Sequence, residues 1–320
     1  LLHPVTMWRV FKAGFKQDCD VYHCHELDSL LIGYLLSKFK SKRLIYDAHE
    51  AYSDWMFNIL KRDYGTIAIL LRPIIRRLES FLTKKSDIVL TVNEPMKDIY
   101  KKLGGDPVIV IGNYPSLSSF SNSNIKSIKI EGINEGDTVI GRIGGMHIDT
   151  GILETIQAFK LLEKKLNNVK LLLIGRISPP NFKEVVKDAI GNDKNIILLN
   201  PIPYEMVPSY YQFIDISVVL ARPTKNNEIG LSIKLLESMC CGIPTITSFG
   251  YDTEIVKETD SGLIAGWKDI EDIAQKMEIL VKDPELRKKL GENGRRAIKE
   301  KYNWDTAERE LFTAYRKLEG

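Results

Sequence analysis

The segment NNEIGLSIKLLESMCCGIPTITS (residues 226–248) places a lysine and a glutamate one turn apart near the start of an expected helix. Ser232 is a suitable N-cap, and Gly242 marks the end of the helix. A helix N-terminus has unpaired N–H groups and a partial positive charge, so it favours a phosphate, and Lys234 adds a full charge. Glu237 can accept hydrogen bonds from both hydroxyls of a ribose. The pattern indicates a nucleotide diphosphate site, although a capped surface helix with an ordinary Lys/Glu pair fits the spacing equally well.

A histidine with an adjacent glutamate ends an expected strand in the first half of the chain, in the run YDAHEAYSD. A neutral imidazole at His49 can donate a hydrogen bond to a sugar hydroxyl or to a departing phosphate oxygen. On spacing alone, a histidine that satisfies a loop carbonyl is the better interpretation.

Metal binding is not favoured by the linear spacing. His23 and His25 share one face of an expected strand, but a third ligand at suitable spacing is missing. The Asp18-Cys19-Asp20 run matches a metal-binding D-x-D, yet it begins a strand instead of ending one. We therefore expect no metal ion and no cofactor.

Short β-branched runs alternate with helical patterns along the chain, which is typical of stacked βαβ units with parallel sheets. The expected strands are 20–25, 43–49, 87–92, 108–113, 137–144, 169–175, 195–200, 215–221, 244–248 and 262–266. The Ser- and Asn-rich segment 113–127 separates two series of strands and is the expected interdomain linker. Two Rossmann-like domains would place ligands at the carboxyl ends of their strands.

Composition is that of a globular chain of two domains, with 320 residues, 44% apolar and 27% charged, and a formal net charge of +3. This charge is too small to indicate nucleic acid as a partner. Neither a signal peptide nor a membrane-spanning run is evident. The four cysteines have no zinc-type spacing and favour a reduced, cytoplasmic protein; they are Cys19, Cys24, Cys240 and Cys241.

The run SIKLLESMCCGIPTITS resembles the nucleotide-binding helix of family 4 retaining glycosyltransferases, which have the GT-B fold. The runs DVYHCHELDSLL, LIYDAHEAYSD, SDIVLTVNEPM and DPELRKKLGENGRRAIKEKYNW agree with this resemblance in the expected order. It implies an α/β protein whose two Rossmann-like domains face a central cleft. It also implies transfer of a hexose or N-acetylhexosamine from a nucleotide diphosphate sugar, of UDP or GDP type, to a glycan or lipid-linked acceptor.

The resemblance also implies which residues act. It assigns catalytic roles to His49 and Lys234, and nucleotide-sugar contacts to Gly144, Gly145, Arg176, Ile202, Asn227, Ser232, Lys234, Leu235 and Glu237. The leaving diphosphate would itself accept the proton of the acceptor hydroxyl, so no separate carboxylate base is needed. The implied domains are 1–115, joined by the helix 304–320, and 128–303.

The sequence departs from the family pattern at three places. Many members have a glutamate eight positions before the ribose glutamate, where this chain has Ile229; which of Asn226, Asn227 and Glu228 contacts the sugar stays open. Thr150 stands where the family has a phosphate-binding Arg or Lys, so the charge must come from Lys234, with Arg142 and Arg176 as further candidates. Roughly the first two βα units of the first domain are missing from the pattern, so we expect an exposed sheet edge and reduced activity.

A basic segment from Trp55 to Lys85, which includes Arg72, Arg76 and Arg77, predicts peripheral contact with an anionic membrane at its cytoplasmic face. A solvated helix face is equally compatible with it. Two other functions fit the pattern: a sugar-nucleotide 2-epimerase of the same fold, with carboxylates among Glu26, Asp47 and Glu50, and a non-catalytic nucleotide-binding remnant.

Overall fold

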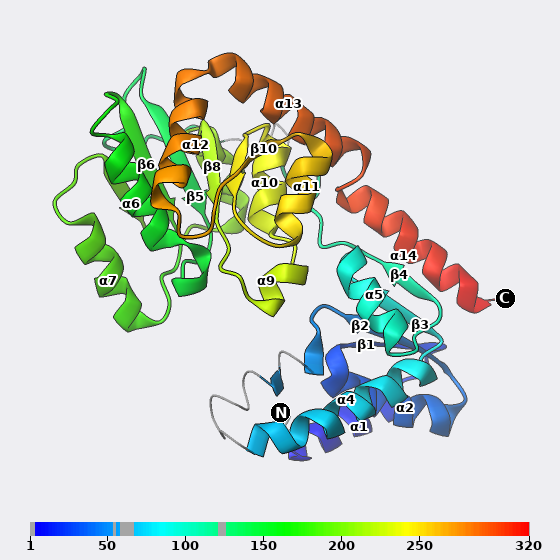
Figure 1. Ribbon diagram of the computed structural model, residues 1–320. Helices are drawn as coiled ribbons and strands as arrows, with labels where there is room; N and C mark the ends of the chain where they lie inside the picture. The colour runs from blue at the N-terminus through cyan, green and yellow to red at the C-terminus, as the bar shows by residue number, and fades with distance from the viewer. Residues whose placement is uncertain (1–3, 54–55, 58–66, 121–125, 320) are drawn as a thin grey trace. The chain divides into compact units, whose positions relative to one another are not determined.

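The computed structural model describes residues 4–53, 56–57, 67–120 and 126–319, which form two compact units (Figure 1). Unit 1 combines Leu1–Asn113 with Asp305–Gly320, and unit 2 is Tyr114–Trp304. The last helix therefore returns to the first unit. Residues 121–125 of the predicted linker lie outside the described residues.

Unit 1 contains a parallel sheet in the order β1-β2-β3-β4. Its strands are β1 (Val21–His25), β2 (Arg43–Ala48), β3 (Ile88–Thr91) and β4 (Val108–Val110). Its helices are α1 (Pro4–Lys16), α2 (Glu26–Lys40), α4 (Ile67–Lys85), α5 (Glu94–Lys102) and α14 (Trp304–Glu319, all but the first residue).

Side chains of the unit 1 strands alternate between two buried faces, as parallel sheets require. On one face, Ile45, Ile88 and Leu90 pack against Ala314 of α14, which is fully buried. Tyr46, on the opposite face, is also fully buried, and its hydroxyl lies 3.1 Å from that of Tyr100 on α5. Because α14 covers one face, the C-terminal segment completes the core of the first unit.

Unit 2 contains a parallel sheet in the order β10-β9-β8-β5-β6-β7. Its strands are β5 (Thr138–Ile143), β6 (Val169–Ile174), β7 (Ile196–Leu199), β8 (Ile216–Val219), β9 (Thr245–Thr247) and β10 (Gly262–Ile264). The chain runs outward from β5 in one direction through β6 and β7, and in the other through β8, β9 and β10. The strand order therefore reverses between β5 and β8, which is the place where open α/β sheets bind ligands.

Helices cover both faces of the unit 2 sheet (Figure 1). They are α6 (Ile152–Leu162), α7 (Pro180–Ile190), α8 (Val207–Tyr211), α9 (Lys225–Ile229), α10 (Ile233–Cys241), α11 (Tyr251–Thr259), α12 (Ile270–Lys282) and α13 (Pro284–Glu300), with short 3₁₀ turns η2 (Ile148–Thr150) and η3 (Tyr204–Met206). Phe159 of α6 and Met277 of α12 pack on one face, and Tyr211 of α8 packs on the other. Leu235 and Met239 bury the apolar side of α10.

All ten expected strands are present, each shorter at one or both ends than the sequence pattern predicted. Between the expected strand 215–221 and the helix that Ser232 begins, the sequence pattern predicts no element, but the structure has the short helix α9 (Lys225–Ile229). Thr224 caps this helix by accepting a hydrogen bond from the Asn227 N–H at 3.2 Å. In the described part of the chain, every helix is too short or too polar to cross a bilayer.

Candidate functional site

A pocket of about 280 Å³ lies at the carboxyl ends of β5 and β8, where the strand order reverses. It is lined by Arg142, Gly145, His147, Asp149, Thr150, Val219, Leu220, Ala221, Asn227, Gly230, Leu231, Ser232, Lys234 and Asp252. Four of the residues expected to bind a nucleotide sugar therefore line one pocket: Gly145, Asn227, Ser232 and Lys234. Its position agrees with the general rule for ligand sites in open α/β sheets.

Lys234 enters this pocket across a glycine. A Cβ atom on Gly144 would lie 2.6 Å from Lys234 Cε, and Gly144 has a φ of +130°. Gly175 packs behind it, since a Cβ there would lie 1.9 Å from the Gly144 carbonyl oxygen. A residue without a side chain is thus required at both positions. Gly144 therefore acts by making room for the lysine stem, whereas Gly145 borders the pocket.

Arg142 supplies a second, buried cation to the pocket. Only 5% of the residue is exposed, and Nη1 donates to the Val218 carbonyl at 3.1 Å. Its Nε has no hydrogen-bond partner among the described residues. Burial lowers the pKa of Arg142 to about 10, so the guanidinium stays charged at neutral pH. A buried charge with an unsatisfied donor is costly, and an anion in the pocket would offset that cost.

The N-terminus of α10 differs in one respect from the sequence prediction. Ser232 occupies the N-cap position, but its side chain makes no capping hydrogen bond. Its backbone N–H instead donates to Asp252 Oδ1 at 2.7 Å. Burial raises the pKa of Asp252 to about 7. Ser232 therefore ties α10 to α11 and leaves its hydroxyl at the pocket wall.

Thr150 and Asn227 line the pocket through hydrogen-bonded turns. The Thr150 hydroxyl donates to the His147 carbonyl at 2.6 Å and accepts from the His147 N–H at 3.1 Å, so it braces the turn after β5. Asn227 Nδ2 donates to the Arg222 carbonyl at 2.8 Å. Burial lowers the pKa of His147, which favours a neutral imidazole in the pocket wall.

Glu237 lies one turn beyond Lys234 and is 5% exposed. Burial raises its pKa to about 7, while the charge of Lys234 and a hydrogen bond from Tyr204 partly oppose this shift. Tyr204, in η3 after β7, is half exposed at 51% and was not among the predicted site residues. Its place in a loop after a strand was a usable signal, because such loops face ligands in this fold class.

Glu237 and the remaining predicted contacts lie outside the lining of this pocket. Leu235 is fully buried in the core behind α10, and Ile202 packs against the apolar cluster between the sheet and α8. Arg176 is exposed after β6, where its carbonyl accepts the Met146 N–H at 2.8 Å. His147 and Asp252 line the pocket but were missed, since neither follows a motif in the sequence.

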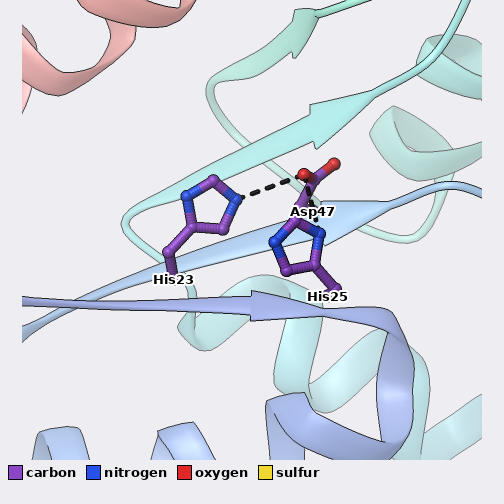
Figure 2. Close-up of side chains that lie close together, drawn as sticks. All are labelled: His23, His25 and Asp47. Carbon is purple, nitrogen blue, oxygen red and sulfur yellow. Dashed lines mark hydrogen bonds and ion pairs between the residues drawn. The ribbon is translucent and has the colours of Figure 1, made fainter. Parts of the chain in front are cut away.

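Unit 1 brings three histidines around one carboxylate. Asp47 Oδ2 lies 3.2 Å from His23 Nε2, 3.1 Å from His25 Nδ1 and 3.4 Å from His49 Nε2. Figure 2 shows His23 and His25 of β1 directed at Asp47 on the neighbouring strand. Burial alone would raise the pKa of Asp47, but hydrogen bonds from His23 and His49 outweigh it and hold the pKa well below its usual value.

The sequence shows no third donor at suitable linear spacing beside His23 and His25, but the fold brings Asp47 next to them. One potential donor atom from each of the three residues lies within 4.8 Å of the others. Spacing along the sequence could not identify Asp47, because it lies on β2, 22 positions after His25. The parallel register of β1 and β2 pairs His25 with Asp47. Linear spacing detects ligands within one turn or loop and misses those joined by sheet pairing.

Two family models match this chain. The model described as glycosyl transferases group 1 matches residues 123–297, and the model described as glycosyltransferase family 4 matches residues 1–114. The two matches fall largely in unit 2 and in unit 1, respectively.

Curated proteins and a solved structure agree with these matches. The capsular polysaccharide biosynthesis glycosyltransferase CapM of Staphylococcus aureus is 31% identical over 57% of this chain, a match that spans about half of that relative (48%). The N-acetyl-alpha-D-glucosaminyl L-malate synthase of Bacillus anthracis is 23% identical over 96% of this chain and 77% of its own. HepE of Anabaena, solved with UDP and glucose, is 14% identical and superimposes with a TM-score of 0.75, over 98% of this chain and 82% of its own.

Proposed function

Since this chain belongs to the glycosyl transferases group 1 family and has the GT-B fold, we propose that it transfers a hexose or N-acetylhexosamine from a nucleotide diphosphate sugar to a hydroxyl group, with retention at the anomeric carbon. The observation that carries this proposal is the pocket at the β5/β8 reversal, where Lys234, Arg142 and the start of α10 face one space. Two cations and helix N–H groups suit a diphosphate.

The donor in this proposal is of the UDP type. HepE, which has the same fold, was solved with UDP and glucose, and this supports a uridine nucleotide over GDP. Glu237 would accept hydrogen bonds from the ribose hydroxyls one turn beyond the diphosphate. The hydrogen bond that Tyr204 donates to Glu237 would break as the ribose binds. The name of CapM supports a glycan as the acceptor class.

The transfer step itself needs only the groups already described. As the bond from the anomeric carbon to the diphosphate breaks, negative charge grows on the leaving oxygen, and Lys234 and Arg142 stabilise it. The acceptor oxygen bonds to the anomeric carbon on the face that the diphosphate leaves, which gives retention, and its proton passes to the leaving diphosphate. For His49 we propose a hydrogen bond to the transferred sugar. No cofactor enters this step.

Isothermal titration calorimetry with UDP, GDP and ADP tests the donor site. We expect UDP to bind, and Glu237→Ala to weaken it by roughly 1.5 to 3 kcal/mol, about tenfold or more, because a charge-assisted contact is lost. Lys234→Met should weaken UDP more than uridine, which has no phosphates. Glu285→Ala and Lys288→Met are matched controls, since both residues are exposed on α13.

Two outcomes would contradict the donor site. The first is equal affinity in wild type and Glu237→Ala, which would remove Glu237 from the ribose. The second is absence of binding by all three nucleotides, which would favour the non-catalytic remnant.

Peripheral membrane contact through α4 is a further part of this proposal. Trp55, Lys61 and Arg62 of the predicted basic segment lie outside the described residues. The described part of α4 exposes Arg76, Arg77, Lys84 and Lys85 together with large apolar side chains, which suits an anionic bilayer surface. These apolar side chains are Ile69 (58% exposed), Leu70 (73%), Ile74 (60%), Leu78 (37%) and Phe81 (46%).

Flotation with liposomes that contain anionic lipid tests the membrane contact. We expect wild type to float, and the double variant Arg76→Glu, Arg77→Glu to stay in the soluble fraction, because each basic residue near the surface contributes about 1 kcal/mol. The double variant Lys187→Glu, Lys194→Glu in unit 2 is the charge-matched control. Equal flotation of both double variants would remove α4 from the membrane contact.

A further inference from the structure

The cluster around Asp47 has the donor atoms of a metal site. His23 and His25 present imidazole nitrogens from one strand, and Asp47 presents a carboxylate oxygen from the next (Figure 2). The two rings are stacked with centroids 4.8 Å apart and planes inclined by 16°. Imidazole nitrogen with carboxylate oxygen is the ligand set that zinc and its neighbours in the first transition row prefer.

Two of the three separations between the donor atoms are those of ligands on one ion. Asp47 Oδ2 lies 3.2 Å from His23 Nε2 and 3.1 Å from His25 Nδ1. Ligands that bind tetrahedral zinc at about 2.0 Å lie roughly 3.3 Å apart. All three atoms lie within 4.8 Å of one another. The side chain of His25 is 63% exposed, so a turn of this ring would bring its Nδ1 to a similar separation from His23 Nε2.

More imidazole nitrogens surround Asp47 Oδ2 than this oxygen can accept hydrogen bonds from. A carboxylate oxygen has about two lone-pair directions, yet three imidazole nitrogens lie within 3.4 Å of Asp47 Oδ2. Two of these, His25 Nδ1 and His49 Nε2, are also only 3.2 Å apart. One cation at this point would bind the lone pairs of His23 and His25 and leave His49 as the single donor to Asp47.

The surroundings fit the outer shell of such a site. His23 Nδ1 lies 2.7 Å from the hydroxyl of Tyr315 on α14. If Nδ1–H donates to this oxygen, the Nε2 lone pair faces Asp47, and this is how outer-shell partners fix the tautomer of a ligating histidine. Asp47 is 14% exposed and His23 is 21% exposed, whereas His25 opens the cluster to solvent. Two of the ligands are therefore held in place by their surroundings, and an ion can enter from solvent beside His25.

We infer that unit 1 binds a divalent ion of the zinc class through His23 Nε2, His25 Nδ1 and Asp47 Oδ2, with an open position toward solvent. His49 is a neighbour of this site that hydrogen-bonds Asp47, and it is not a ligand. The inference does not depend on the proposed diphosphate pocket, because the ligands belong to unit 1 and that pocket belongs to unit 2. His49, which the proposed transfer step uses, adjoins the site only through Asp47 and His25.

Metal binding by the full chain, freed of metal with a chelator, tests this inference. Zn²⁺ alone is titrated by calorimetry, and Co²⁺ alone is followed by its visible absorption, which reports imidazole ligation in a tetrahedral site. We expect one ion per chain. His25→Ala should weaken binding by more than about a hundredfold, beyond the loss typical of an outer-shell change, and Tyr315→Phe by about tenfold.

Three controls make the result specific. His25 is exposed, so His25→Ala should keep the far-ultraviolet circular dichroism of wild type and show that lost binding is not lost folding. His147→Ala removes a histidine of unit 2 and should leave the affinity unchanged. His49→Ala removes an outer-shell donor to Asp47 and should keep the ion with about a tenfold loss of affinity, well short of the loss in His25→Ala.

The inference would be overturned by absence of a stoichiometric ion, or by Zn²⁺ affinity that is equal in wild type and His25→Ala. Binding that survives in His25→Ala would place the ion elsewhere, for example on cysteine thiols. Nucleotide binding is a separate readout, so failure of the metal site and failure of the donor site are distinguishable.

Discussion

At the scale of single residues, the chemistry of the donor pocket comes from burial as much as from residue type. Lys234 and Glu237 are three positions apart on α10, but the lysine reaches into the pocket while the glutamate is 5% exposed. Burial raises the pKa of Glu237 to about 7, into the physiological range. The same residue on an exposed helix would stay ionised at all relevant pH values.

The affinity for UDP should therefore depend on pH through Glu237. Below pH 7 the free protein holds Glu237 mostly protonated, and above it the carboxylate is ionised. Ribose hydroxyls donate best to the ionised form, so the affinity should rise roughly tenfold between about pH 6 and about pH 8. Calorimetry of UDP across this range measures the slope.

The glutamine variant separates this effect from the titration of UDP itself. Glu237→Gln cannot ionise, so its pH profile should be flatter than that of wild type by the contribution of Glu237. Parallel profiles for the two proteins would show that Glu237 does not contact the nucleotide.

At the scale of elements, α14 decides whether the sheet of unit 1 has a covered face. Ala314 is fully buried against Ile45, Ile88 and Leu90, and Leu311 and Leu318 of α14 pack at the edges of this cluster. Parallel sheets are covered on both faces because their strands are apolar on both. A helix about 190 residues further along the chain than β4 thus belongs to the fold of the first unit.

Ala314→Arg should strongly destabilise unit 1. The substitution puts a charged, larger side chain into a packed apolar cluster, and we expect a loss of about 3 kcal/mol or more in the free energy of unfolding. Thr313→Arg, one position away on the exposed face of α14, should change it by no more than about 0.5 kcal/mol. Urea unfolding followed by circular dichroism compares the two; similar midpoints would mean that α14 does not cover this face in solution.

At the scale of the whole molecule, the chain has two units with separate cores and separate candidate sites. The diphosphate pocket lies within unit 2 and the histidine cluster lies within unit 1. A ligand that binds only the folded form of one unit stabilises that unit by mass action.

UDP should accordingly stabilise unit 2 by about 2.7 kcal/mol at a concentration near a hundred times its Kd. Hydrogen exchange with mass spectrometry locates the effect, and we expect slower exchange in the segments of β5, β8 and α10, with no change in β2 and β3 of unit 1. Slower exchange confined to unit 1 would show that the nucleotide binds unit 1, and this result would contradict the donor site in unit 2.

The sequence by itself determined the alternation of strands and helices and the end of α10. These features depend on local rules: β-branched runs extend, Gly242 ends a helix, and an apolar stripe turns inward. Lys234 was identified for the same reason, since its spacing from Ser232 places it in the first turn of a helix. Local geometry is carried by neighbouring residues, so it can be read in order along the chain.

Tertiary structure alone decided which distant residues meet. Sheet pairing places Asp47 beside His25, and the order of strands places Arg142 of β5 beside the loop after β8. Glu237 also receives a hydrogen bond from Tyr204 of η3, which belongs to another segment of the chain. The physical reason is that strand register, burial and the resulting pKa values are set by packing between elements. A pattern read along the chain does not describe contacts between segments that are far apart in it.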